Sequence, residues 1–495
     1  MSRLIVVSNR VNPPNPADGE SSTGGLAMAL AAALREYSGI WFGWSGKTVP
    51  EFSGQLNMQR IDGVTVATVD LEETDYQEYY NGYANKTLWP LFHYRVDLTA
   101  YDRSFGQGYD RVNRLFAETL LPLIEPDDIV WIHDYHLIPL ARELRRLGVT
   151  NRIGFFLHIP WPAHQLVVTL PRHRQLVEAL FDYDLIGFQT EESLQAFEGY
   201  VFSEVEGSKT ERGELVAFGK RARAAAFPIG VDAQDFARLV DGDTARKVYD
   251  RMMAHSVFRK MVVGVDRLDY SKGLEERLIG FERFLHDHPE LRREVMLLQI
   301  APISRDEVEA YQDLRVRLDG LIGRINGAYA EMDFTPIRWV NRSYRRDELA
   351  GVYRASKAAL VTPLRDGMNL VAKEFVAAQD PEDPGVLILS RFAGAARQMK
   401  DALIINPNSP EEVSDALDRA LSMDLTERQR RWRTLFDNVQ REDVTAWRDD
   451  FVSALKGESI SDTATAPLPR PRVQSLDTAA KALKARNTEA QDVRA

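Results

Sequence analysis

The chain has 495 residues, of which 44% are hydrophobic and 27% charged, which is the composition of a soluble globular protein with more chain than one hydrophobic core usually supports. Its formal net charge of -11 argues against nucleic acid as a partner, and the absence of cysteine excludes disulfides, thiolate metal sites and a cysteine nucleophile. The apolar run at residues 4–7 is too short for a secretory signal, and no window approaches the length of a membrane span. We therefore expect a cytoplasmic protein with two compact folding units and no membrane segment.

Short apolar runs rich in valine, isoleucine and phenylalanine alternate with helical patterns along most of the chain. This alternation predicts an α/β protein whose parallel sheets are covered by helices. The predicted strands form two series, at residues 4–7, 129–132, 153–157 and 185–188, and at residues 261–265, 295–300, 337–340, 359–361 and 386–389. The predicted fold is two Rossmann-like, doubly wound units in series, facing each other across a cleft.

A segment rich in proline and glycine, residues 226–232, separates the two series of strands. We therefore place the two units at residues 1–232 and 233–431, and we expect a terminal helix at residues 432–455 to pack back on the first unit. Residues 457–495 are rich in serine, threonine, alanine and proline without a sustained apolar face, which predicts a disordered tail.

The first candidate ligand contacts follow the first strand. Arg10 ends that strand, and Gly24 and Gly25 open a predicted helix at residues 26–37. Glycines let the backbone approach a ligand closely, and a helix N-terminus offers free N–H donors to a phosphate. Taken alone, the same pattern is equally typical of a tight turn before a helix packed on a strand.

Polar side chains also follow the next two predicted strands. His133, Asp134 and His136 come after residues 129–132, and His158 comes after residues 153–157. Doubly wound sheets bind ligands at the carboxyl ends of their strands, although a single histidine there is more often a structural hydrogen bonder. A metal site is the other interpretation, but the spacing of these residues is not that of a ligand set, so we expect no metal and no cofactor.

In the second unit, Arg267 and Lys272 lie in the loop after the predicted strand at residues 261–265. Two cations there suit a diphosphate that gains negative charge as its bond breaks. Each cation by itself would by default be a solvated surface charge.

The most informative segment is residues 361–374. Asp366 lies in a loop beside Gly367, and Asn369 is a candidate N-cap of a helix that carries Glu374. Such a turn can present carboxylates to sugar hydroxyls and free amides to a phosphate. The segment therefore predicts a ligand that combines a polyol with a phosphate.

Eight segments stand in a fixed order along the chain: VSNR (7–10), WFGWSG (41–46), EYYN (78–81), LWP (88–90), WIHDYH (131–136), FFLHIP (155–160), RLDYSKG (267–273) and LRDGMNLVAKE (364–374). Together they resemble the trehalose-6-phosphate synthase family, retaining GT-B glycosyltransferases of family GT20. The likeness runs from Ser2 to about Leu455. It implies transfer of glucose from UDP-glucose to glucose 6-phosphate, the first step of trehalose biosynthesis, in a stress response.

The resemblance also implies a set of donor-binding residues, with Glu374 on the ribose and Asp366 on the transferred glucose. The whole set is Gly24, Gly25, Arg267, Lys272, Tyr344, Asp366, Leu370, Val371, Ala372, Lys373 and Glu374. Similar bacterial members have a phenylalanine near the base where this chain has Tyr344. The added hydroxyl can change discrimination at the base edge, so the choice among UDP, ADP and GDP stays open.

By the same resemblance, the acceptor-binding residues are Arg10, Tyr80, Asp134 and Arg305, with the two arginines on the phosphate. Trp89 and His158 would select the α anomer. The catalytic residues would be Asp366, His158, Arg267 and Lys272. The implied mechanism is a front-face displacement without a metal, in which the leaving phosphate takes the acceptor proton and closure of the cleft excludes water.

Three alternatives stay open on the sequence alone. The first is a related transferase with another donor, or with another acceptor such as glycerol 3-phosphate. The second is a glycoside hydrolase that uses Asp366 and Glu374 as its pair of carboxyl groups. The third is a sugar-phosphate sensor without turnover. The assembly is equally open, and a homodimer or homotetramer is compatible with the sequence.

Overall fold

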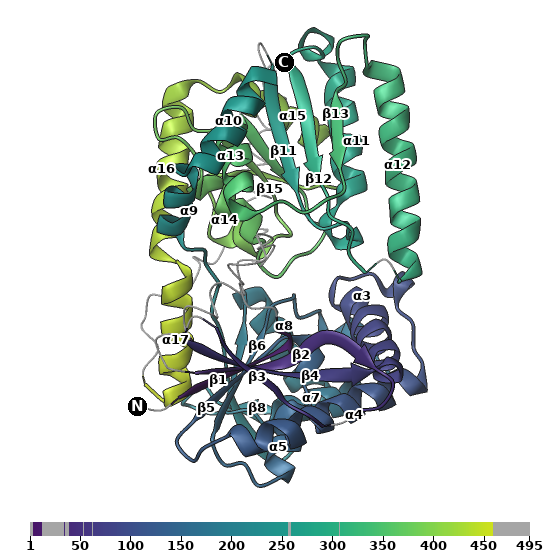
Figure 1. Ribbon diagram of the computed structural model, residues 1–495, viewed down its shortest axis with the longest axis vertical. Helices are drawn as coiled ribbons and strands as arrows, with labels where there is room; N and C mark the ends of the chain where they lie inside the picture. Colours follow the sequence, from purple (N-terminus) through teal and green to yellow (C-terminus); the bar gives the residue numbers. More distant parts are fainter. Residues whose placement is uncertain are drawn as a thin grey trace, which may run out of the picture. The chain divides into compact units, whose positions relative to one another are not determined.

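The computed structural model describes residues 3–11, 34, 39–52, 54–61, 63–255, 259–305 and 307–458. The predictions for Gly24, Gly25, most of the helix at residues 26–37 and nearly all of the tail lie outside these residues. Two β-sheets with helices around them make up the described part of the chain (Figure 1).

The first sheet has ten strands in the order β3-β4-β2-β1-β5-β6-β7-β10-β9-β8. The strands from β4 to β10 in this order pair in parallel, whereas the edge strands β3, β9 and β8 pair antiparallel. Their bounds are β1 Leu4–Arg10, β2 Ile40–Val49, β3 Asn57–Ile61, β4 Val64–Glu72, β5 Ile129–His133, β6 Arg152–Leu157, β7 Leu185–Phe188, β8 Ser208–Lys209, β9 Leu215–Ala217 and β10 Lys220–Ala226. The central strands β5 and β7 are buried along their whole length, as expected for strands covered on both faces.

The second sheet has six strands in the order β13-β12-β11-β14-β15-β16, and every pair is parallel. Their bounds are β11 Lys260–Val265, β12 Val295–Ile300, β13 Ile337–Val340, β14 Ala358–Val361, β15 Val386–Ser390 and β16 Leu403–Ile405. This is the 3-2-1-4-5-6 order of doubly wound nucleotide-binding sheets, and strands β4-β2-β1-β5-β6-β7 of the first sheet repeat it. The predicted fold class is confirmed. We call the two sheets with their helices the first and second lobes.

Helices cover both sheets. Those of the first lobe are α2 Glu73–Asp75, a π-helix Tyr76–Leu88, α3 Trp89–Phe92, α4 Arg103–Leu120, α5 Leu140–Arg146, α6 His164–Val167, α7 His173–Leu180 and α8 Glu191–Glu204. Those that follow in the chain are α9 Ala233–Val240, α10 Asp243–His255, α11 Leu274–Asp287, α12 Glu309–Tyr329, α13 Arg346–Ala355, α14 Leu370–Ala377, α15 Pro410–Ser422, α16 Leu425–Arg441 and α17 Val444–Lys456. Short 3-10 turns lie at Val96–Leu98, Leu121–Leu123, Tyr135–Leu137, Tyr270–Lys272, Pro289–Leu291 and Gly394–Arg397.

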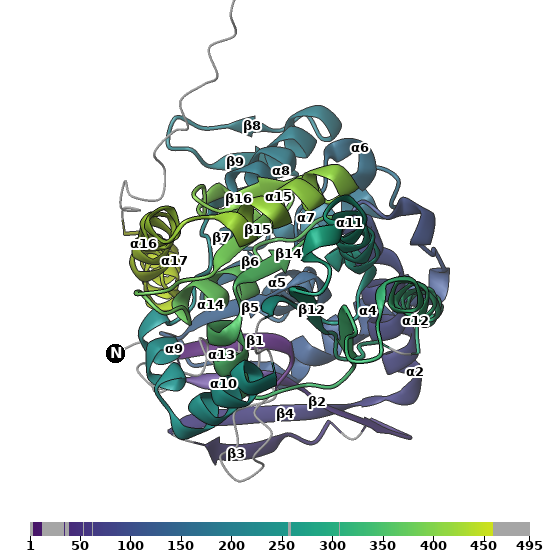
Figure 2. The same cartoon turned by 90° about the horizontal axis from the view of Figure 1, so that it is seen from above.

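The helices of the second lobe lie on both faces of its sheet. In Figure 2, α11 and α15 lie together on one face, and α10, α13 and α14 lie on the other. This arrangement leaves the carboxyl ends of the parallel strands free of helices, so the loops that follow β11, β12 and β14 are available to bind a ligand.

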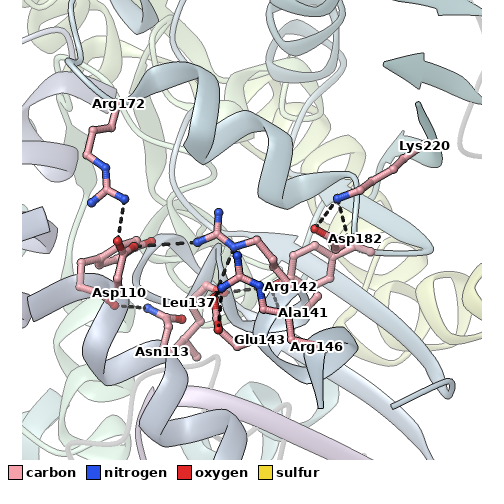
Figure 3. Close-up of polar contacts among 12 residues, drawn as sticks. Asp110, Asn113, Leu137, Ala141, Arg142, Glu143, Arg146, Arg172, Asp182 and Lys220 are labelled. Atoms are coloured by element: carbon pink, nitrogen blue, oxygen red, sulfur yellow. Dashed lines mark hydrogen bonds and ion pairs between the residues drawn. The ribbon is translucent and has the colours of Figure 1, made fainter. Parts of the chain in front are cut away.

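Ion pairs lie within and between the helices, strands and loops of the first lobe (Figure 3). Arg172 donates to Asp110 of α4 at 2.6 Å, and Lys220 of β10 donates to Asp182 at 2.9 Å. Glu143 of α5 accepts from Arg146 at 2.9 Å. Apart from Glu143, which is buried, these side chains are at least partly exposed, and exposed pairs individually contribute only about 0–1 kcal/mol. The cluster is therefore a structural feature of the lobe.

Residues 432–455 were predicted as one helix, and this prediction is wrong. The chain forms two helices, α16 and α17, that are separated at Glu442 and Asp443. Asp443 caps α17, because its side chain accepts a hydrogen bond from the N–H of Ala446 at 2.8 Å. The backbone at the break packs tightly on Gly230, where a Cβ would lie 2.1 Å from the carbonyl oxygen of Glu442. The aspartate cap, rather than the apolar pattern, decides where the second helix begins.

Helix α17 packs on strands β6 and β7 of the first lobe, and it lies along that lobe in Figure 1. Two glycines on these strands, Gly154 and Gly187, leave room for its aromatic side chain Phe451, since a Cβ at either position would lie within 2.8 Å of that ring. None of the helices in the described residues is long and apolar enough to cross a membrane. The boundaries of the two predicted units and the cytoplasmic location stay predictions.

Candidate active site

A cavity of about 810 Å³ lies where the strand-end loops of both lobes meet. The loop that holds Gly367 approaches the first lobe so closely that a Cβ on this glycine would lie 2.0 Å from the carbonyl oxygen of His158. A second cavity, of about 400 Å³, shares Arg10, Tyr80 and Arg305 with the first one. The two cavities are therefore adjacent.

Most of the predicted site residues line the larger cavity. They are Arg10, Tyr80, His158, Arg267, Lys272, Arg305, Tyr344, Asp366, Leu370, Val371 and Glu374. Four predicted residues are not part of its lining: Trp89, Asp134, Ala372 and Lys373. The structure thus brings together residues that are more than 300 positions apart in the sequence.

Lys272 and Asp366 form an ion pair in the second lobe. The Lys272 Nζ lies 2.5 Å from Oδ2 of Asp366, and both side chains are 14% exposed. Asn369 donates to the same carboxylate oxygen at 3.1 Å. Burial raises the pKa of Asp366, but the lysine and the amide outweigh it, so that the net pKa is lowered and the carboxylate stays charged. The pair holds a negative charge and a positive charge side by side at the cavity wall.

Asn369 begins helix α14 beside this pair, as predicted. Its side chain accepts a hydrogen bond from the N–H of Ala372 at 3.1 Å, and the cavity is lined by Leu370 and Val371 in the first turn. The helix N-terminus therefore presents partial positive charge to the cavity. One turn on, burial raises the pKa of Glu374, while Arg346 opposes this shift.

Arg305 is held from several sides. Its guanidinium carbon lies 3.8 Å from the centre of the Trp89 ring, which is stacking distance, and Nη1 donates to the hydroxyl of Tyr311 at 2.6 Å. The carboxylate of Asp269, which is fully buried, lies 3.4 Å from the same nitrogen. Burial raises the pKa of Asp269, but Arg305 and Arg267 lower it to about 2. The Nε of Arg305 is buried without a hydrogen-bond partner in the described part of the chain.

Asp134 lies directly behind His158. Its Oδ1 accepts a hydrogen bond from the backbone N–H of His158 at 3.2 Å. Burial raises the pKa of Asp134 to about 6, against the lowering effect of Arg305 and Arg267. The same burial lowers the pKa of His158 to about 3, so this histidine is neutral at pH 7.

Three site residues have a backbone conformation that is uncommon for L-amino acids. Asp134, Arg305 and Asn369 have φ angles of 76°, 52° and 83°. A non-glycine residue in this region is strained, and such strain is concentrated at ligand sites. The observation independently marks this cavity as functional.

The sequence analysis missed several residues near the cavity, and two of these contact predicted site residues. Gln189 lines the cavity and contacts His158, and Asp269 holds Arg305. Asp269 lies within the segment RLDYSKG, which was a usable signal, whereas Gln189 lies outside all of the quoted segments. Among the described residues, no group of three or more histidine, aspartate or glutamate side chains is arranged to hold a metal ion.

The family model of glycosyltransferase family 20 matches residues 2–457 of the chain. A trehalose-6-phosphate synthase of Sinorhizobium fredii is 48% identical over 461 residues, which cover 93% of this chain and 99% of that protein. A trehalose-6-phosphate synthase of Cronobacter sakazakii is 48% identical over 456 residues, which cover 92% of this chain and 95% of that protein.

Two solved structures share the fold closely. An alpha,alpha-trehalose-phosphate synthase (UDP-forming) from Burkholderia xenovorans, in complex with glucose-6-phosphate, matches with a TM-score of 0.88 and 50% identity, covering 92% of this chain and all of that one. A structure described as trehalose-6-phosphate from E. coli bound with UDP-2-fluoro glucose matches with a TM-score of 0.88 and 45% identity, over 92% of this chain and 100% of that one. The chain therefore belongs to glycosyltransferase family 20 and, within it, to the trehalose-6-phosphate synthases (UDP-forming), the glycosyltransferases of the first step of trehalose synthesis.

Proposed function

We propose that the chain transfers glucose from UDP-glucose to glucose 6-phosphate, giving α,α-trehalose 6-phosphate and UDP. The observation that carries this proposal is the charge distribution around one cavity. Arg267, Lys272 and the N-terminus of α14 supply positive charge from the second lobe, and Arg10 of β1 and Arg305 supply it where the two cavities adjoin. Two phosphorylated sugars can therefore be bound at once. The ligands named for the two similar structures support the same pair of substrates.

The donor occupies the part of the cavity formed by the second lobe. Arg267 and Lys272 bind the diphosphate together with the free amides of the first turn of α14. Glu374 accepts hydrogen bonds from the ribose diol, Tyr344 lies against the base, and Asp366 accepts from hydroxyls of the transferred glucose. Ala372 and Lys373 support this turn rather than contact the donor with free polar groups, because the N–H of Ala372 donates to Asn369 and the Nζ of Lys373 donates to the carbonyl of Ile229 at 2.7 Å.

The acceptor lies where the two cavities adjoin. Arg10 and Arg305 bind its phosphate, and Tyr80 contributes its hydroxyl and ring edge. Asp134, which is partly exposed, accepts from sugar hydroxyls. Trp89 holds Arg305 by stacking and, with His158, favours the α anomer.

The reaction is a front-face displacement with retention. The acceptor hydroxyl oxygen forms a bond to C1 of glucose on the face from which UDP leaves, the bond from C1 to the diphosphate oxygen breaks, and the hydroxyl proton passes to the leaving phosphate. Lys272, Arg267 and the amides of α14 stabilise the negative charge that develops on the diphosphate. Because these groups supply the positive charge, the mechanism works without a metal ion, and closure of the two lobes keeps water away from C1.

The direct test is an assay of the purified chain with UDP-glucose and glucose 6-phosphate in the presence of a chelator. UDP release is followed, and the sugar product is identified by mass and NMR. A phosphorylated α,α-1,1-linked disaccharide is the expected product. Activity that depends on an added divalent metal would overturn the mechanism, and faster turnover with ADP-glucose or GDP-glucose would overturn the donor assignment. A chain inactive with UDP-glucose, ADP-glucose and GDP-glucose that still binds both ligands would be a sensor.

Glu374→Ala is expected to weaken the binding of UDP-glucose by about 10–100-fold, because a charged acceptor for the ribose diol is lost. The affinity for glucose 6-phosphate, titrated separately by calorimetry, is expected to stay within about twofold. Glu382, which is exposed just beyond α14, is the matched control: Glu382→Ala should bind both substrates as the parent does. Equal losses for both substrates in Glu374→Ala would contradict the separate donor subsite.

The raised pKa of Asp134 predicts a pH dependence of acceptor use. Below its pKa of about 6 the side chain is protonated and accepts hydroxyl hydrogen bonds less well, so kcat/KM for the acceptor should fall about tenfold per pH unit. A phosphate monoester also titrates near pH 6, so the profile is repeated with glucose 6-sulfate, whose charge is constant. The fall should persist with the sulfate and disappear in Asp134→Asn; a profile that is flat with the sulfate would refute the assignment.

The proposal extends to the organisation of the chain. We infer one unit at residues 1–232, completed by helix α17, and a donor-binding unit at residues 233–431. We also infer a cytoplasmic enzyme that acts as a homodimer or homotetramer. Light scattering on the full chain measures this assembly directly.

A further inference from the structure

Gln189 lines the cavity but belongs to none of the sequence motifs. It follows strand β7 directly and is 2% exposed. Its Oε1 accepts a hydrogen bond from the backbone N–H of Ile229 at 3.0 Å, and its Nε2 lies 3.3 Å from Nδ1 of His158. We propose that Gln189 is a positioning residue that fixes the tautomer of His158, with the ring hydrogen on Nε2.

The backbone of Ile229 decides which end of the glutamine amide faces the histidine. A backbone N–H can only donate, so the side-chain atom that meets it has to be the carbonyl oxygen of Gln189. The NH2 group, which can only donate, is then left facing Nδ1 of His158. This nitrogen must accept with its lone pair, and a neutral imidazole with a bare Nδ1 carries its hydrogen on Nε2.

The Ile229 peptide is held in place from the second lobe. Its carbonyl oxygen accepts a hydrogen bond from Nζ of Lys373, at 2.7 Å, and the lysine side chain is fully buried on α14. The N–H and the carbonyl of one residue, which belong to two successive peptide groups, are therefore held from opposite lobes. A backbone held on both sides in this way can orient the amide of Gln189 reliably, because neither peptide group can turn without breaking a buried hydrogen bond.

The tautomer of His158 also determines the tautomer of a second histidine, His133. Nε2 of His158 lies 3.0 Å from Nδ1 of His133, so the hydrogen on Nε2 is donated there. His133 then carries its own hydrogen on Nε2. Burial lowers the pKa of His133 well below its usual value, as it does for His158, so both rings are neutral and each has one hydrogen to place. One direction of donation therefore runs from Gln189 through both rings.

The consequence for the reaction rests on the proposed function, in which His158 helps to select the α anomer. In the assigned tautomer both ring nitrogens of His158 are engaged within the protein, because Nδ1 accepts from Gln189 and Nε2 donates to His133. The two hydrogen bonds hold the ring in one orientation at the cavity wall. A variant in which one of these buried hydrogen bonds is lost lets the ring turn, and kcat/KM should fall by about 10–100-fold.

The tautomer itself can be measured by two-bond ¹H–¹⁵N correlation NMR on the full chain labelled in its nine histidines, without any substrate. The His158 signals are assigned by their loss in His158→Gln. The expected result in the parent is hydrogen on Nε2. In Gln189→Glu the carboxylate can accept from both Ile229 and the ring, so the hydrogen should move to Nδ1. In Gln189→Met neither tautomer is favoured, and a mixture is expected.

Kinetics provide the second measurement. Gln189→Met leaves Nδ1 of His158 without a hydrogen-bond donor and should lower kcat/KM by about 10–100-fold, whereas Gln189→Glu keeps a hydrogen bond to the ring in the reversed direction and should lower it less. Gln107 is exposed on α4, so Gln107→Glu, which adds the same charge, should behave as the parent in both measurements.

A parent protein with hydrogen on Nδ1 of His158 would overturn the proposal, and so would an unchanged tautomer in Gln189→Glu. If Gln189→Glu does not fold, the tautomer of His158 in the parent and in Gln189→Met still tests the proposal. A parent with the assigned tautomer but no turnover of UDP-glucose and glucose 6-phosphate would leave the proposal standing and refute the proposed function instead.

Discussion

Replacing Lys272 with methionine is expected to lower kcat by about 10²–10³-fold, because the charge that stabilises the departing diphosphate is removed while most of the length of the side chain is kept. The KM values of both substrates should change less than kcat, since the negative charge on the diphosphate grows mainly in the transition state. Steady-state kinetics with varied donor and acceptor measure the three constants. Lys400, which is exposed, is the control, and Lys400→Met should be indistinguishable from the parent.

A structural effect has to be separated from this catalytic one, because Lys272→Met leaves the carboxylate of Asp366 without its partner. The single variant should therefore lower the free energy of unfolding. Adding Asp366→Asn removes the unpaired charge and should recover part of that loss, as measured by urea denaturation. The double variant should still turn over slowly. Recovery of kcat together with stability would show that Lys272 acts only through the fold.

Arg305→Ala is expected to raise the KM for glucose 6-phosphate by about 10–100-fold, because a charge-assisted contact with the phosphate is lost. The dissociation constant of UDP-glucose should stay within about twofold. Unphosphorylated glucose, used as a poor acceptor, should be affected much less, so the preference for the phosphorylated acceptor should shrink. Arg315 is exposed on α12, and Arg315→Ala should leave all of these values unchanged.

The same variant tests how Arg305 is held. Its removal leaves Asp269 buried without the nearest of the two arginines that lower its pKa. Arg305→Lys keeps a positive charge near Asp269 but loses the planar stacking on Trp89. We expect Arg305→Lys to recover stability but only part of the acceptor affinity. If Arg305→Lys binds the acceptor as tightly as the parent does, the planar guanidinium stacked on Trp89 has no role in acceptor binding.

The strands of the central sheets were predictable from the sequence, because buried parallel strands are continuous apolar runs. Strands β5, β7 and β12 lie within a residue of their predicted bounds. The strands β2, β3 and β4 were not predicted. Strand β3, Asn57–Ile61, carries exposed polar side chains at the sheet edge, so it has no apolar run to detect.

The cavity was predictable wherever a residue follows a strand in a recognisable segment, as Asp366 and Arg267 do. It was not predictable where a residue's role depends on a distant partner. Gln189 is oriented by a backbone N–H that lies 40 positions further along the chain, and no local pattern signals this contact. Lys373 is the opposite case. Its segment predicted a ligand contact, but its side chain is fully buried and donates to the carbonyl of Ile229 instead.

Gly154 of β6 and Gly187 of β7 form a groove for Phe451, and this groove determines how chimeras of this enzyme and its relatives have to be built. Phe451 fits over Gly154 and Gly187 only because neither has a side chain, so the groove and the ring are a matched pair contributed by opposite ends of the sequence. A chimera that takes residues 1–232 from one parent and the remainder from another would separate that pair. The exchangeable module is therefore discontinuous, and a graft that carries α17 along with the first lobe takes both halves of this contact from the same parent.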